Sequence, residues 1–230
     1  MNIGFDLDKI FIDYPLFVPD VLINTLYKQK SNGVLLYRIP SRVERSLRIL
    51  THYPFFRPPI ISNIQFVEDL AKSKKHKHYL ISSRFSFLKH QTELIVNKYK
   101  LGKIFDAMFF NFKDQQPHIF KDQVIKKMKI TLYVDDDLPL LEYLADKNPK
   151  VRFFWLNTMQ NKKLGKNLFA IKNLSEMFSN RIHLRGVAPQ HLGGGPLRPP
   201  RLPSRRDEAD GEAGSEASRK DSSEVSSRQP

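Results

Sequence analysis

Two short apolar segments of this chain each end in carboxylates, and this feature constrains the fold most. Residues 2–5 run into Asp6-Leu7-Asp8, and residues 132–134 run into three consecutive aspartates at 135–137. An unpaired buried charge is very costly, so these carboxylates do not fit the interior of a core. They fit two parallel strands whose carboxyl ends meet in one crevice, where open α/β sheets bind ligands.

Carboxylates gathered in one crevice repel one another unless a hard cation such as Mg²⁺, which prefers oxygen ligands, lies among them. The two segments therefore predict a metal-dependent site. The chain contains no cysteine, so neither a disulfide nor a thiolate metal site can form within it.

The chain has 230 residues, of which 40% are hydrophobic. This is enough for a core in one domain that carries an insertion or a tail. Asp6, Asp8 and Asp13 interrupt the first apolar residues, and no segment reaches the roughly 20 apolar residues that span a bilayer. We expect a cytoplasmic protein without a membrane partner, and the sequence does not indicate its oligomeric state.

The formal net charge is +14. A balance this basic favours phosphate-bearing partners, either nucleic acid or small phosphoesters. A lysine-rich surface that reflects biased coding composition explains the charge equally well. Charge alone therefore does not choose among these interpretations.

The composition changes sharply near residue 180. Residues 181–230 contain no Phe, Tyr or Trp, and they carry 6 Gly, 6 Pro and 8 Arg with a single Lys. Residues 1–180 hold 22 Lys and 7 Arg. The second segment cannot bury enough apolar surface to offset its ordering entropy, so we expect a disordered tail. A fusion, a frameshift or an assembly artefact would produce the same change.

Within residues 1–180, apolar runs that predict strands alternate with apolar residues at helical spacing. This alternation predicts an α/β fold with a mostly parallel sheet covered by helices on both faces. The expected strands span residues 2–6, 78–82, 107–111, 131–135 and 151–156, and the expected helices span residues 88–99, 122–129 and 138–145.

Residues 13–75 break this alternation. Residues 41–44, Ser-Arg-Val-Glu, have the pattern of a capping box, and residues 62–65, Ser-Asn-Ile-Gln, are a second candidate box. We therefore expect a helical insertion that covers the crevice as a cap. The apolar stripe of its first helix would consist of Val43, Leu47 and Leu50.

Four pieces follow one another along the chain: Asp6 with Asp8, Ser82 at the end of the second strand, Lys121 just before a helix, and Asp135 with Asp136. In this order and at these boundaries they resemble the four motifs of the haloacid dehalogenase superfamily of phosphohydrolases. The resemblance covers residues 1 to about 157 and implies a Rossmann-like three-layer fold. It implies a hydrolase domain over residues 1–180 with a C1-type helical cap at about 13–75.

The resemblance also implies a role for each residue. Asp6 would be the nucleophile that forms an aspartyl-phosphate, and Asp8 would be the general acid and base. Lys121 would balance negative charge, and Ser82 would hold a phosphate oxygen. The implied Mg²⁺ ligands are Asp6, the backbone carbonyl of Asp8, and Asp135 and Asp136, directly or through water.

The chain departs from the family pattern directly after Asp8. Members usually carry Gly and then Thr or Val there, whereas this chain has Lys9 and Ile10. Ile10 is a mild change, but Lys9 either tunes the choice of substrate or marks a weakened site. Arg84 follows Ser82 by two residues, so it is a candidate contact for the substrate.

Two functions remain open from the sequence. The first is a Mg²⁺-dependent phosphoric monoester hydrolase that acts on a nucleotide or another small phosphometabolite. The second is a catalytically weak or inactive domain of this type that binds nucleic acid through its basic surface. Salt-dependent retention of nucleic acid without turnover would favour the second. We favour the small phosphorylated substrate over nucleic acid.

Overall fold

The computed structural model describes residues 1–15, 28–31, 34–157 and 164–178. The predicted disordered tail, residues 181–230, lies outside this part of the chain. None of the helices in the described part has the length and hydrophobicity needed to cross a bilayer.

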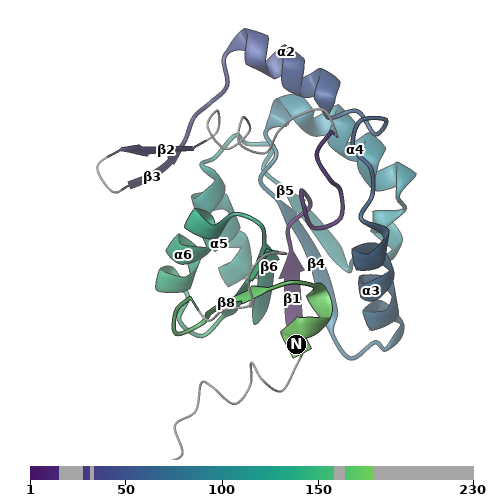
Figure 1. The fold of residues 1–230 in the computed structure, drawn as a ribbon, viewed down its shortest axis with the longest axis vertical. Coiled ribbons are helices and arrows are strands. Elements are labelled where there is room, and N and C mark those ends of the chain that lie inside the picture. Colours follow the sequence, from purple (N-terminus) through teal and green to yellow (C-terminus); the bar gives the residue numbers. More distant parts are fainter. Residues whose placement is uncertain (16–27, 32–33, 158–163, 179–230) are drawn as a thin grey trace, which may run out of the picture. The chain divides into compact units, whose positions relative to one another are not determined.

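Six strands form the central sheet (Figure 1). Their order is β5-β4-β1-β6-β7-β8, and every neighbouring pair is parallel. The five predicted strands are present. The sixth strand, β8, was not predicted. The strands are β1 (Asn2–Phe5), β4 (Lys77–Ser82), β5 (Ala107–Phe110), β6 (Leu132–Asp135), β7 (Arg152–Leu156) and β8 (Leu168–Ile171).

Helices cover both faces of this sheet. Side chains of α3 (Ile61–Lys72) and α4 (Lys89–Lys98) enter one buried cluster, and those of α5 (Pro117–Lys127) and α6 (Leu138–Lys147) enter another. This confirms the predicted Rossmann-like, three-layer α/β fold. The described part of the chain also contains three short 3₁₀ helices: η1 (Ser86–Leu88), η2 (Leu101–Lys103) and η3 (Leu174–Phe178).

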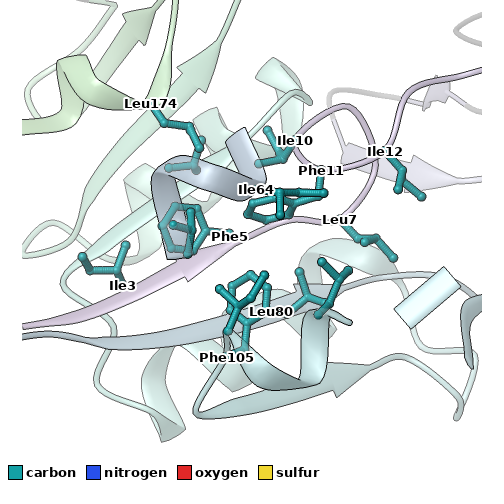
Figure 2. Close-up of a cluster of buried hydrophobic side chains, with 14 of the residues drawn as sticks. Ile3, Phe5, Leu7, Ile10, Phe11, Ile12, Ile64, Leu80, Phe105 and Leu174 are labelled. Carbon is teal, nitrogen blue, oxygen red and sulfur yellow. The ribbon is translucent and has the colours of Figure 1, made fainter. Parts of the chain in front are cut away.

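The loop after β1 is anchored in the core. Phe5 of β1 packs edge-on against Phe11 with ring centroids 5.8 Å apart, and Leu7 is also fully buried. Figure 2 shows these side chains in the same cluster as Leu80 of β4. Burial of this apolar surface holds the loop, so the carboxylates of Asp6 and Asp8 have a defined position.

Gly4 lets the middle of the sheet pack closely. A Cβ atom at this position would lie 2.8 Å from Cδ2 of Tyr133 and 3.1 Å from Cδ1 of Ile81. Tyr133 occupies this space, and its hydroxyl donates a hydrogen bond of 3.0 Å to the carboxylate of Asp135. The absence of a side chain at residue 4 thus helps to position a carboxylate of the neighbouring strand.

The insertion differs from the prediction in its first half. Instead of being helical throughout, it contains an antiparallel hairpin of β2 (Lys28–Ser31) and β3 (Val34–Tyr37). The signal in the sequence is Asn32-Gly33, a dipeptide typical of two-residue hairpin turns. The insertion is therefore a mixture of strand and helix, and a purely helical cap of the C1 type is not confirmed.

The two helices of the insertion begin differently. α2 (Arg42–Thr51) begins with the predicted capping box, in which Ser41 and Glu44 bond each other's backbone N–H. The second predicted box was wrong, because α3 begins at Ile61 and its N-cap residue, Ile60, has no polar side chain. Two apolar residues of α3, Ile64 and Val67, lie in the buried cluster and decide where this helix lies.

The predicted apolar stripe of α2 does not face the core. Val43 is 80% exposed, and Leu47 and Leu50 are also exposed. The buried side chain of this helix is that of Arg48. The amphipathic pattern therefore identified the helix correctly but not the side that packs on the domain.

We expect Gly4→Ala to lower the free energy of unfolding by about 1–3 kcal/mol, because the new methyl group overpacks the contact with Tyr133. Urea denaturation measures this change. Gly102→Ala is the matched control, because a Cβ atom there would lie at an ordinary 3.8 Å from Met108. Equal stability of the two variants would contradict the close approach at Gly4.

Candidate active site

Three adjacent strands bring the predicted residues to one edge of the sheet. Asp6 directly follows β1, Ser82 ends β4, and Asp135 ends β6. Because β1 lies between β4 and β6 and all three are parallel, these residues share the carboxyl edge. Ser82 is buried there.

Lys121 of α5 joins two of the carboxylates. Its ammonium group donates hydrogen bonds of 2.7 Å to Asp6 and 2.6 Å to Asp135. Lys121 and Asp135 are only 2% and 1% exposed. Burial alone would lower the pKa of Lys121, but the charges of Asp135 and Asp6 raise it well above its usual value. The lysine is therefore a permanent cation between the two strands.

Asp6, Asp135 and Asp136 form a set of candidate metal ligands. One carboxylate oxygen from each residue lies within 4.8 Å of the others. Burial, together with the charges of Asp135 and Asp8, raises the pKa of Asp6 to about 7, although Lys121 opposes the shift. Burial and the charges of Asp135 and Asp6 also raise the pKa of Asp136 well above its usual value. Three crowded carboxylate oxygens fit a hard divalent cation such as Mg²⁺.

Asp8 lies in a different electrostatic environment. Arg84 donates to both of its oxygens, from Nε at 2.8 Å and from Nη2 at 2.9 Å, and Arg57 adds a bond of 2.8 Å. Burial would raise the pKa of Asp8, but the guanidinium groups of Arg84 and Arg57 hold it well below its usual range. In this arrangement Asp8 is a carboxylate and has no proton to donate.

Arg84 therefore contacts Asp8, and a further bond of 3.3 Å joins it to Thr92. Its predicted contact with a substrate stays a prediction. The bond between the backbone carbonyl of Asp8 and Mg²⁺ also stays a prediction.

Sequence reasoning missed Arg57, which comes from the loop between α2 and α3. It is 1% exposed, and it also donates hydrogen bonds to His52 at 2.8 Å and to the carbonyl of Asp13 at 3.2 Å. The ring of Tyr14 lies 4.9 Å from the guanidinium carbon. The signal in the sequence is an arginine between aromatic residues and Pro58, a position where a solvated charge is unusual.

His52 accepts the bond from Arg57 because it is neutral. Its Nδ1 lies 2.7 Å from the carbonyl of Arg48, so Nδ1 carries the proton and Nε2 faces Arg57. Burial and the charges of Arg57 and Arg84 lower the pKa of His52 well below its usual value. The histidine thus orients Arg57 without adding a positive charge.

Lys9 has a backbone conformation that glycine favours. Its φ is 59°, in the left-handed region that residues with a Cβ atom rarely adopt. Its ammonium group donates to Asp13 at 2.8 Å and lies 4.4 Å from the ring of Tyr14. The side chain therefore pairs with Asp13 within the loop after β1.

Comparisons with known proteins gave matches to solved structures alone. No protein-family model matches the sequence, and the search of curated proteins found no match. The chain is similar to a putative β-phosphoglucomutase from Thermotoga maritima, with 15% identity and a TM-score of 0.49 over 80% of this chain and 99% of that one.

Two further structures are described as members of the haloacid dehalogenase family. One, from Streptococcus pneumoniae, has 12% identity and a TM-score of 0.41 over 68% of this chain and 84% of that one. The other, from Bacteroides thetaiotaomicron, holds magnesium and inorganic phosphate, with 12% identity and a TM-score of 0.44 over 70% and 95%.

Because these TM-scores are below 0.5, the assignment of the fold rests on the strand order and the motif positions of this chain. The chain has the Rossmann-like α/β fold that the resemblance to the haloacid dehalogenase superfamily implies. The fold that the resemblance implies is thus confirmed.

Without a divalent cation, we expect the protein to lose stability as the pH rises toward about 7. The pKa of Asp6 is raised above its value of 3.8 in an unfolded chain, so only the folded protein holds this proton between the two values. That stabilisation is present at low pH and is lost as the pH rises through the folded pKa. Thermal unfolding in EDTA between pH 5 and pH 8 measures it.

Asp6→Asn should reduce this pH dependence, because the amide does not titrate, and Mg²⁺ should reduce it in the wild type. Equal slopes for the wild type and Asp6→Asn in EDTA would contradict the raised pKa of Asp6.

At residue 9, we expect glycine to be more stable than alanine by about 1 kcal/mol, since the left-handed conformation costs residues with a Cβ atom roughly that much. Both Lys9→Gly and Lys9→Ala lose the pair with Asp13, so the difference between them isolates the backbone term. Urea denaturation of the two variants gives the difference. A more stable Lys9→Ala would rule out the strained backbone.

Proposed function

We propose that this protein is a Mg²⁺-dependent phosphatase that hydrolyses a small phosphomonoester through an aspartyl-phosphate on Asp6. The observation that supports this most is the buried cluster of Asp6, Lys121 and Asp135 at the carboxyl edge of the sheet. A carboxylate, a fixed cation and a candidate metal site in one place suit a reaction that depends on positioning and electrostatics.

In this proposal a carboxylate oxygen of Asp6 attacks phosphorus and the leaving group departs. Lys121 neutralises negative charge on Asp6 and on the phosphoryl group, and Ser82 donates a hydrogen bond to a phosphate oxygen. Mg²⁺, when bound, would supply further positive charge for the phosphoryl oxygens. The residues that would hold it are Asp6, Asp135, Asp136 and, through its carbonyl, Asp8.

The proposed acid–base role of Asp8 requires a rearrangement. A carboxylate with two guanidinium partners holds no proton, so at least one arginine has to release it first. Arg84 is the arginine proposed to contact substrate. If a phosphate oxygen takes over hydrogen bonds of Arg84, Asp8 loses its bidentate partner and can accept or donate a proton.

The proposed substrate is a small phosphometabolite, with a nucleotide as one candidate. The basic charge of the chain fits any phosphate-bearing partner. It is also the observation behind the second candidate function, a domain that binds nucleic acid without turnover. Retention of nucleic acid that falls with salt, with no phosphate release from any substrate, would favour that second function.

We expect the wild type to release phosphate from at least one member of a phosphometabolite panel with Mg²⁺ and not with EDTA. Asp6→Asn should lower the rate by about 10³-fold or more, because an amide is a poor nucleophile. Its melting temperature in EDTA should not fall, since the change removes one of the crowded buried charges. Phosphate release and thermal unfolding measure both effects.

The matched control is Asp69→Asn, since Asp69 is exposed and pairs with Lys72 on the surface. This variant should keep the wild-type rate. Phosphate release by Asp6→Asn at the wild-type rate would show that Asp6 is not the nucleophile.

A further inference from the structure

Tyr37, the last residue of β3, ties the inserted hairpin to the start of α5. The side chain of Gln116, the residue before α5, accepts a hydrogen bond of 3.0 Å from the backbone N–H of Tyr37. The same side chain donates a bond of 3.2 Å to the backbone carbonyl of Tyr37. This pair repeats the pattern of a strand ladder, so the end of β3 has a fixed position relative to α5.

The hydroxyl of Tyr37 reaches the start of α6 as well. It donates a hydrogen bond of 2.7 Å to Oδ2 of Asp137, the N-cap residue of that helix. The capping bond from the N–H of Leu140 to Asp137 is long, at 3.5 Å. The tyrosine therefore makes the shorter of these two contacts to the carboxylate of Asp137.

Asp137 in turn holds one of the candidate metal ligands. Its backbone N–H donates 3.1 Å to Oδ1 of Asp135, and Lys121 donates to the other oxygen of Asp135. Lys121 belongs to α5, which begins directly after Gln116. The contacts thus form a closed ring from Gln116 through Tyr37, Asp137, Asp135 and Lys121 back to α5.

The ring of Tyr37 is itself held in place. It stacks on His118 of α5 with centroids 6.3 Å apart, and Tyr143 of α6 packs edge-on against the same histidine at 4.7 Å. Burial and the charge of Asp137 raise the pKa of Tyr37 above its usual value. The hydroxyl therefore stays protonated and can donate to Asp137 throughout the working range of pH.

We propose that Tyr37 is a positioning residue of the candidate cation site and that it couples cation binding to the attachment of the β2–β3 hairpin. The proposal rests on the cation site of the proposed function. Tyr37 holds Asp137, and Asp137 orients Asp135 toward the cation. Because coupling between two equilibria is reciprocal, a hairpin that favours cation binding is itself held more firmly when the cation is bound.

The test is Mg²⁺ binding to the full chain by titration calorimetry, without substrate. We expect Tyr37→Phe to weaken binding about 5- to 50-fold, which lies within the range of typical coupling between sites. Tyr143→Phe is the matched control, since Tyr143 packs on the same histidine, and it should bind Mg²⁺ like the wild type.

Amide hydrogen exchange gives a second readout that does not depend on activity. Mg²⁺ should slow exchange at the N–H of Tyr37 in the wild type and have a clearly smaller effect in Tyr37→Phe. If Tyr37→Phe fails to fold, Gln116→Met is the alternative variant. It removes the two hydrogen bonds between the side chain of Gln116 and the backbone of Tyr37, and it should also weaken Mg²⁺ binding.

Unchanged Mg²⁺ affinity in Tyr37→Phe, or in Gln116→Met if that variant replaces it, would overturn the proposal. A wild type that binds no Mg²⁺ would overturn it together with the cation requirement of the proposed function. A wild type that binds Mg²⁺ in a Tyr37-dependent way but hydrolyses no phosphomonoester would support the positioning role and refute the phosphatase. The failures of the two proposals are therefore distinguishable.

Discussion

The buried contact of Lys121 with Asp6 and Asp135 is the interaction on which the rest of the site depends. It joins α5 to β1 and β6 in a nearly dry environment, where loss of Lys121 would leave the buried carboxylates without a counter-charge. Gly4 admits Tyr133, Tyr133 bonds Asp135, and the apolar loop after β1 fixes Asp6. The packing of the sheet and the electrostatics of its carboxyl edge are thus parts of one arrangement.

The carboxyl edge of the sheet consists of two halves that differ in their balance of charge. Three acidic groups, Asp6, Asp135 and Asp136, surround the single positive charge of Lys121, whereas Asp8 is held by two guanidinium groups. The first half carries a surplus of negative charge once Asp6 and Asp136 lose their protons, and such a surplus suits a divalent cation. The second has a surplus of positive charge that suits a phosphate. A site divided in this way fits a phosphoryl substrate that arrives beside a metal ion.

Local pattern located the strands and the carboxylates at their ends. Apolar runs such as residues 132–134 show where a parallel strand is buried, and a polar residue that interrupts the run shows where it ends. The same reasoning failed for α2, whose apolar stripe is exposed. It also missed the β2–β3 hairpin and the short strand β8. A hydrophobic pattern reports that an element is amphipathic, not which neighbour it meets.

The sequence by itself determined the α/β class, the parallel strands and the gathering of Asp6, Ser82 and Asp135 at one edge, because each follows from local periodicity and strand direction. Only the tertiary structure decided what the charged groups contact. Arg57 and Arg84 meet Asp8 across 49 and 76 residues, and Tyr37 meets Asp137 across 100. Such pairs depend on how segments far apart in the sequence fold against one another, which no local pattern records.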